Sequence, residues 1–167
     1  MAYQLEWTGR KTGHKYLYYN LTHPVGLSVG STEDDTMLIQ ALFRVIFYET
    51  RVIEPPAGHK GIAVDGKCGN VTQTHMRAYK QWMRRNGMPT VADGKIDPIE
   101  GNPNDAATPL HHDRYVLETL NYQSITECEK KGLAKRRDFH SAPREDIPEP
   151  LFKALQTRGT VLNWPFN

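Results

Sequence analysis

The same tight-turn chemistry occurs twice in this chain, and it constrains the fold more than any other feature. The first copy is the pair Asp65-Gly66 and the second is the pair Asp93-Gly94. Glycine tolerates a positive φ, and an aspartate side chain can accept a hydrogen bond from its own backbone. Both pairs therefore predict tight turns, placed before and after one stretch with a helical pattern.

Three segments show that helical pattern. Residues 33 to 49 follow a helix start at Ser31 or Thr32, which precedes three acidic residues, and residues 71 to 85 end at Asn86-Gly87. A third helix is expected over about residues 110 to 122. The apolar side chains that predict the first helix recur at helical spacing: Met37, Leu38, Ala41, Leu42, Val45 and Ile46.

The two ends of the chain have different patterns. Residues 3 to 21 alternate in two runs around a glycine-containing turn, which predicts a β-hairpin. An isolated hairpin is barely stable in water, so we expect it to pack on the helices. After Gln123 the chain becomes charged and proline-rich, with one short helix expected over residues 151 to 155. The apolar side chains near the C-terminus predict that this tail docks on the body as well.

The order of several residues around the turns carries further information. Gln40 lies upstream of the first turn, Gly69 and Thr72 follow it, and the second turn comes after the second helix. This succession resembles the three-helix type of peptidoglycan-binding domain. The resemblance implies a mainly α fold, with a helical bundle over residues 30–122, an N-terminal β-hairpin extension over 1–29 and a C-terminal extension over 123–167. Its structural motif residues would be Gln40, Gly69, Thr72, Tyr79, Asp93 and Gly94.

These motif residues have expected backbone roles. Gly66 and Gly69 should both be required by the backbone, and the hydroxyl of Thr72 should satisfy free amides at the start of the second helix. The chain also departs from the family pattern. Cys68 replaces a phenylalanine and His75 replaces a small residue. We expect Cys68 to be a buried, inert thiol rather than a nucleophile activated by His75.

The resemblance implies non-catalytic binding of bacterial cell-wall peptidoglycan in a groove beside the second helix. Cationic side chains there would meet the carboxylates of the stem peptide. The residues expected to bind the ligand are Asp65, Gly66, Lys67, Arg77, Lys80, Trp82 and Arg84.

A second interpretation uses the same fold as a protein-interaction or structural module of a bacterial secretion system or a phage particle. Flat aromatic side chains suit sugar rings and protein interfaces equally well, so they do not separate the two. The aromatic residues expected to be exposed for either purpose are Trp7, Tyr16, Tyr18, Tyr19 and Trp82.

Catalysis, metals, cofactors and nucleic acid receive little support from the sequence. His111 and His112 are adjacent, so on a helix they point about 100° apart and are poorly placed to chelate together. No paired carboxylates suited to glycosidase chemistry stand out, and neither flank of the module is long enough for a catalytic domain. A net charge of +2 is small for a nucleic-acid binder. We therefore interpret the chain as a binder and not as an enzyme.

The sequence also bears on location. No apolar run reaches the roughly 18 to 20 residues of a membrane helix, and no signal peptide is visible at the N-terminus. We expect a protein that stays in the cytoplasm or is exported to the cell envelope by a dedicated machine. Cys68 and Cys128 are the two cysteines, and the sequence leaves their redox state open.

Overall fold

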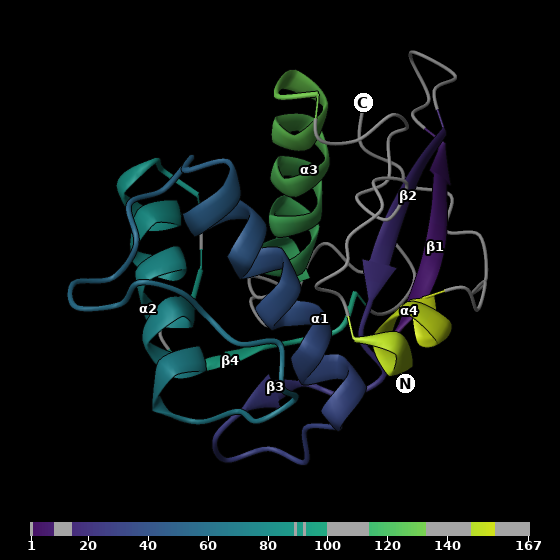
Figure 1. Ribbon diagram of the computed structural model, residues 1–167, viewed down its shortest axis with the longest axis horizontal. Helices are drawn as coiled ribbons and strands as arrows, with labels where there is room; N and C mark the ends of the chain where they lie inside the picture. The colour runs from purple at the N-terminus through teal and green to yellow at the C-terminus, as the bar shows by residue number, and fades with distance from the viewer. Residues whose placement is uncertain are drawn as a thin grey trace.

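Helix α1 (Glu33–Phe43) crosses the centre of the computed structural model, with the other elements arranged around it (Figure 1). On one side lies α2 (Asn70–Arg85), and on the other lies the hairpin of β1 (Tyr3–Thr8) and β2 (Lys15–Asn20). The parts of the chain that the structure describes are residues 2–8, 15–88, 90–91, 93–99, 114–132 and 148–155.

Helix α1 is buried on all sides, not on one face only. Every residue from Asp35 to Phe43 is buried, including the polar side chains of Thr36 and Gln40. Thr32 caps the helix, because its hydroxyl accepts a hydrogen bond from the amide of Asp35 at 3.2 Å. A helix surrounded in this way is the centre of a core, so its polar side chains must find partners inside the protein.

The helix continues beyond Phe43 with a wider winding. Residues Arg44–Glu49 form a π-helix, labelled η1, and the amide of Thr50 donates to the carbonyl of Val45 at 2.8 Å. The hydroxyl of Thr50 donates to the same carbonyl at 2.8 Å. The predicted helix over residues 33 to 49 is thus confirmed in extent, while its last six residues are wound differently from an α-helix.

Helix α2 confirms the predicted second helix to within one residue at its start. Met76, Tyr79 and Met83 form its buried stripe. Gly87 follows the helix with a φ of 74°, as expected for a glycine that ends a helix. The prediction that Lys80 belongs to the solvent-facing side is wrong, because its side chain is only 4% exposed.

The hairpin is antiparallel, and Tyr3 pairs with Asn20 at its base. Two asparagine side chains join β2 to distant backbone. Asn121 accepts from the amide of Tyr19 at 2.8 Å and donates to its carbonyl at 2.9 Å. Asn20 accepts from the amide of Ile99 at 2.7 Å and donates to its carbonyl at 2.8 Å. Each asparagine therefore mimics a neighbouring strand, and these bonds hold β2 to the rest of the protein.

The packing of the hairpin confirms one expectation and corrects another. Tyr18 is 7% exposed and Tyr19 is fully buried, so β2 packs on the body as predicted. For the same reason these two tyrosines are not the exposed aromatic side chains that the sequence suggested. The side chains of Trp7 and Tyr16 lie outside the described part of the structure.

Helix α3 spans Arg114–Lys130 in the described part of the chain, so the predicted end near Tyr122 is wrong. The helix continues because Ser124, Ile125 and Cys128 extend its buried side. The expected boundary between the module and the C-terminal extension, after residue 122, falls within this helix. Residues 110–113, where the third helix was expected to start, lie outside the described ranges.

The expected short helix in the tail is present as α4 (Glu149–Leu155), in which Leu151 is fully buried. The side chains of Phe152 and Leu155 and all of residues 156–167, which hold the other apolar residues of the tail, lie outside the described part of the structure. The described elements form a mainly helical fold with small antiparallel strand pairs. Among the described helices, none has the length and apolar character needed to cross a bilayer.

A second strand pair brings the two halves of the core together. Strand β3 (Val25–Gly26) pairs antiparallel with β4 (Lys95–Ile96), so the second Asp-Gly turn lies beside the loop that precedes α1. A Cβ atom at Gly26 would lie 3.0 Å from the carbonyl oxygen of Gly94. Glycine at this position therefore lets the two backbones approach closely.

The central position of α1 predicts a large effect for a charge placed in it. We expect Leu42→Asp to unfold the protein, because Leu42 is fully buried and an unpaired carboxylate there would cost several kcal/mol. The same substitution at Leu27, whose side chain is 56% exposed, is the matched control and should change stability by about 0.5 kcal/mol or less. Thermal unfolding followed by circular dichroism measures both, and equal melting of Leu42→Asp and wild type would contradict the core assignment.

Candidate functional site

The side-chain amide of Gln40 holds the first Asp-Gly turn against α1. Gln40 is 2% exposed, and its Oε1 accepts from the amide of Asp65 at 3.0 Å and from the amide of Gly66 at 2.9 Å. Its Nε2 lies 2.9 Å from Oδ1 of Asp65. The turn thus contributes two backbone donors and one side-chain acceptor to a single buried glutamine.

The same glutamine also reaches the start of α2. Nε2 of Gln40 donates to the carbonyl of Lys67 at 3.1 Å and to Oγ1 of Thr72 at 3.1 Å. The hydroxyl of Thr72 in turn donates to the carbonyl of Lys67 at 3.2 Å. The expectation that Thr72 caps free amides of α2 is therefore wrong, because its hydroxyl bridges Gln40 and the turn instead.

The turn itself has the predicted chemistry. The amide of Lys67 donates to Oδ1 of Asp65 at 2.9 Å, and Gly66 has a φ of 73°. Burial alone would raise the pKa of Asp65, but the hydrogen bonds from Lys67 and Gln40 and the charge of Lys67 outweigh it and leave this pKa lowered. A Cβ atom at Gly66 would overlap Cγ of Glu33 and lie 3.1 Å from its carbonyl oxygen. Two independent constraints, a positive φ and a close neighbour, therefore require glycine here.

Gly69 does not have the backbone role that the sequence suggested. Its φ is −92°, a value that any residue adopts, and nothing lies within 4 Å of a Cβ atom built on it. It is the N-cap residue of α2, and it supplies no side-chain hydrogen bond there. The prediction that Gly69 is required for backbone reasons is wrong.

The second turn is held by an ion pair between a buried lysine and a more exposed aspartate. Nζ of Lys80 lies 2.7 Å from Oδ1 of Asp93, and the amide of Lys95 donates to the same oxygen at 3.2 Å. Gly94 has a φ of 72°, as predicted for this turn. Lys80 therefore does for the second turn what Gln40 does for the first, because each side chain ties an Asp-Gly turn to a helix.

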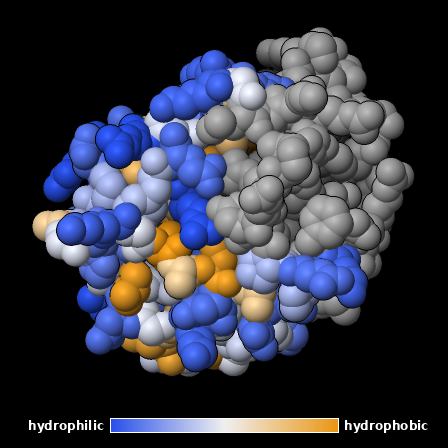
Figure 2. All heavy atoms as spheres, viewed as in Figure 1, coloured by the Kyte–Doolittle hydropathy of each residue, from blue (hydrophilic) through white to orange (hydrophobic). Residues whose placement is uncertain are grey.

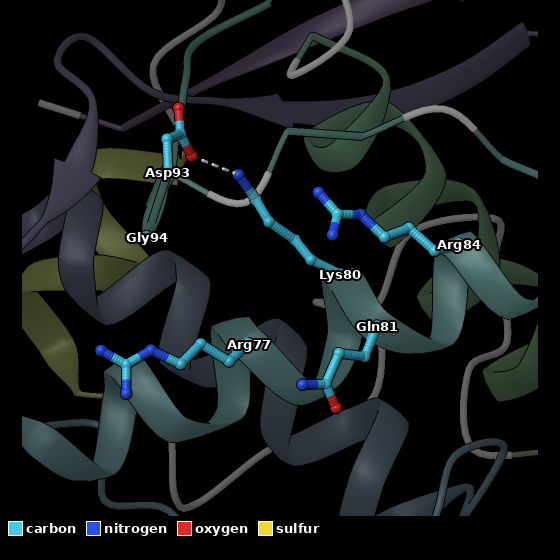
Figure 3. A pocket seen from close by; sticks show the side chains of 6 residues that line it. All are labelled: Arg77, Lys80, Gln81, Arg84, Asp93 and Gly94. Carbon is cyan, nitrogen blue, oxygen red and sulfur yellow. Dashed lines mark hydrogen bonds and ion pairs between the residues drawn. The ribbon is translucent and has the colours of Figure 1, made fainter.

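A pocket of about 310 Å³ lies beside α2 at the second turn. Figure 3 shows Lys80 reaching across it to Asp93, while Arg77, Gln81 and Arg84 extend from α2 around it. Three cationic side chains thus surround one carboxylate, which leaves an excess of positive charge at the pocket. The residues that line it are Arg77, Lys80, Gln81, Arg84, Asp93 and Gly94.

The two arginines that line this pocket differ in the hydrogen bonds that they already make within the protein. Arg84 donates from Nε at 3.3 Å and from Nη2 at 3.1 Å to the carbonyl of Thr90. Arg77 is exposed and makes no hydrogen bond or ion pair with any residue that the structure describes. A guanidinium carries five N–H donors, so Arg77 has its full donor set available to a ligand.

The residues predicted to bind the ligand do not form one site. Asp65 and Lys67 line a separate pocket of about 330 Å³, which also contains Gln40, Ile62 and Thr72. Trp82 is half-buried and stacks on Tyr79, with ring centroids 5.9 Å apart and an interplanar angle of 18°. The structure therefore brings together Arg77, Lys80 and Arg84, and places the first turn and Trp82 elsewhere.

Several important residues were missed by the sequence analysis. Gln81 lines the pocket, and the helical spacing from Arg77 would have indicated this. Two loop histidines, for which the sequence offers no identifiable partner, have partners in the structure. The ring of His59 contacts that of His75 with centroids 5.3 Å apart, and Nδ1 of His23 hydrogen-bonds to the hydroxyl of Thr22 at 3.0 Å. His14 and His140 lie outside the described ranges.

The two cysteines are not joined by a disulfide. Both Cys68 and Cys128 are in the thiol form, and Cys68 is half-buried instead of fully buried as expected. His75 cannot serve Cys68 as a base in this arrangement, because both of its ring nitrogens are engaged by Tyr48 and by the carbonyl of Val71. No group of three or more potential metal ligands occurs among the described residues. The segment His111-His112-Asp113 lies outside them.

The two glycines around the first turn give a matched test of its geometry. We expect Gly66→Ala to destabilise the fold by about 1 to 3 kcal/mol, because of its positive φ and its contact with Glu33. Gly69→Ala should have little effect or raise stability slightly, since Gly69 has an ordinary φ and open space around it. Urea unfolding of both variants measures the difference, and equal midpoints would show that the turn is not built as described.

Comparison with known proteins does not assign the chain to a family or a function. No protein-family model, no curated protein and no solved structure matches the chain.

Proposed function

We propose that this protein is a non-catalytic binder of bacterial cell-wall peptidoglycan, and that the pocket beside α2 is its ligand site. The observation that carries the proposal is the uncommitted guanidinium of Arg77 at the edge of a pocket with excess positive charge. The succession of Gln40, the two Asp-Gly turns and α2, which resembles peptidoglycan-binding domains, supports the choice of ligand.

The chemistry of the pocket suits an anionic group on a small, otherwise polar ligand. Arginine pairs with carboxylates through two parallel hydrogen bonds, and stem peptides of peptidoglycan carry free carboxylates. Arg77 would supply such a pair, while Arg84 has Nη1 beyond the two donors it gives to Thr90. Gln81 adds an amide that can donate and accept. A volume of about 310 Å³ is at the small end of ligand pockets, so one end of a stem peptide is the expected occupant.

The role of Lys80 differs from that of the arginines. Its side chain is 4% exposed and its ammonium is ion-paired with Asp93, so Lys80 shapes the wall of the pocket more than it offers a free charge. Removing it would leave Asp93 without its buried partner and would disturb the turn. Lys80 is therefore unsuitable as a test of ligand binding, whereas Arg77 and Arg84 extend from an exposed helix face.

The pocket offers little for hydrolysis. Asp93 is the one carboxylate among its lining residues, and its Oδ1 accepts from Lys80 and from the amide of Lys95. Cleavage of a glycosidic bond usually needs two carboxyl groups facing each other across the substrate. Binding without reaction is the function that this set of side chains supports.

The alternative function, a protein-interaction or structural module of a secretion system or phage particle, would use a contiguous apolar surface. On the face shown in Figure 2, hydrophilic residues cover most of the described part, and apolar residues gather in its lower centre. Among the described residues, the large apolar side chains that are exposed are Leu27, Val71, Val91 and Tyr122, which lie far apart in the sequence. Single exposed apolar side chains are common on protein surfaces. We therefore place the binding site at the charged pocket beside α2.

Co-sedimentation with purified insoluble cell wall tests the proposal. We expect the wild-type protein to be retained, and we expect Arg77→Gln with Arg84→Gln to reduce its affinity by about tenfold or more, because two charged hydrogen-bond donors are lost. The matched control is Arg85→Gln, an exposed arginine of the same helix that does not line the pocket, and it should bind as wild type does.

Two outcomes would count against the proposal in different ways. Absence of wild-type retention would contradict peptidoglycan binding itself. Equal retention of the double variant would contradict the pocket, and a loss of binding in Lys67→Gln would then move the site to the pocket at the first turn.

A further inference from the structure

His75 is a fully buried histidine with a defined hydrogen-bond arrangement. Its Nδ1 lies 2.7 Å from the carbonyl of Val71, and its Nε2 lies 2.8 Å from the hydroxyl of Tyr48. A carbonyl oxygen can only accept, so Nδ1 carries the hydrogen of the neutral ring. Nε2 is then the acceptor, and the hydroxyl of Tyr48 donates to it. Both the hydroxyl of Tyr48 and the ring of His75 are therefore in their neutral forms in this arrangement.

Aromatic rings surround this histidine. Phe47 meets it edge to face at 5.3 Å between centroids, Phe43 stacks at 6.3 Å, and the ring of Tyr48 lies at 5.7 Å. The ring of His59, from the segment between η1 and α2, meets it at 5.3 Å with an interplanar angle of 67°. His75 therefore joins α2 to η1 and to this connecting segment at one point.

The environment of His75 disfavours its charged form. Burial lowers the pKa of His75, the hydrogen bond to Val71 opposes this effect, and the charge of His59 lowers the pKa further. Tyr48 and His59 are the titratable groups that face the ring from η1 and from the connecting segment, while α1 contributes the uncharged ring of Phe43. Burial raises the pKa of Tyr48, so its hydroxyl keeps its hydrogen. Among the described residues, no carboxylate bonds to His75 to compensate a positive charge.

The connecting segment, residues 51–62, has few other attachments. It contains no helix or strand, and the amide of Val52 donates to the carbonyl of Ile46 near its start. Its apolar anchors are Ile53 and Ile62, which are 6% and 4% exposed. The contact of His59 with His75 lies between these two anchors, so it is well placed to decide whether the middle of the segment stays docked.

We propose that His75 and His59 form an acid-sensitive latch, which holds residues 51–62 against η1 and α2 while His75 is neutral and releases them when His75 takes up a proton. A proton on Nε2 of His75 changes it from an acceptor to a donor, so the hydroxyl of Tyr48 can no longer donate to it. The buried imidazolium then lies against the ring of His59, and in the described residues no carboxylate bonds to either ring to compensate its charge.

The direction of the pH effect follows from the lowered pKa. Above the pKa of an unfolded histidine, about 6.5, the ring is neutral in both states and the docked segment keeps its full stability. As the pH falls below that value, the released state binds the proton more readily than the docked state. The stability of docking is then lost progressively as the pH approaches the lowered pKa of His75 in the docked state.

Release of residues 51–62 would change the pocket at the first turn but not the pocket beside α2. Gly61 and Ile62 line the pocket at the first turn, together with Asp65 and Lys67. None of the residues 51–62 lines the pocket beside α2. The latch is therefore independent of the proposed peptidoglycan site, and acid would act on the first-turn pocket.

Hydrogen exchange measured between about pH 7.5 and about pH 5.0 tests the latch, with rates corrected for the pH dependence of free amides. In wild type we expect the protection of amides in residues 51–62 to fall by about tenfold or more over this range, while α1 keeps its protection. The double variant His75→Phe with Tyr48→Phe replaces both bonded partners by apolar rings of similar shape, so it should fold and lose the pH dependence.

Two further variants keep the result decisive. His59→Phe retains a ring beside His75 but removes a charge that lowers the pKa of His75, so the fall in protection should be smaller while still beginning near the pKa of an unfolded histidine. His23→Gln removes a histidine of another loop and should behave as wild type does. Protection of residues 51–62 that is independent of pH in wild type, or an unchanged pH dependence in His59→Phe and in the double variant, would overturn the proposal.

Discussion

The amide of Gln40 is the interaction on which the rest of the structure depends. Helix α1 is buried on all sides, so a polar group in its middle must be satisfied by other parts of the chain. Gln40 meets this need through the backbone of Asp65 and Gly66 and through the start of α2. Five hydrogen-bond contacts to one side chain place α2 relative to α1, and with α2 they place the pocket that the helix carries.

The second turn repeats this solution with a different chemistry, and the difference has a functional consequence. Asp93 is ion-paired with Lys80 of α2, so the positive charge of this lysine is neutralised where it positions the wall of the pocket. Because this charge is already paired, selectivity for the anionic ligand that we propose would rest on Arg77 and Arg84. The pairing of β3 with β4 adds a backbone connection to the same turn, and the pocket therefore stands on a rigid frame.

The sequence predicted local features well and long-range partners poorly. Periodicity located α2 to within one residue, and the Asp-Gly pairs predicted positive φ at Gly66 and Gly94. The burial of Lys80 could not be predicted, because its partner lies 13 positions away and meets it only through the path of the intervening chain. The same holds for Asn121 and Tyr19, which are 102 positions apart. The π-helical winding of η1 ends at Thr50, whose amide and hydroxyl both donate to the carbonyl of Val45, and no periodicity in the sequence records this contact.

Amide hydrogen exchange at the first turn tests the central claim most directly. Asp65 and Gly66 lie in a loop outside any helix or strand, so their amides would ordinarily exchange fast. If both donate to the buried oxygen of Gln40, they should be protected by about a hundredfold or more, and Gln40→Met should abolish this protection while α1 stays protected. Exchange of both wild-type amides at the rate of a free peptide would contradict the claim that Gln40 holds the turn.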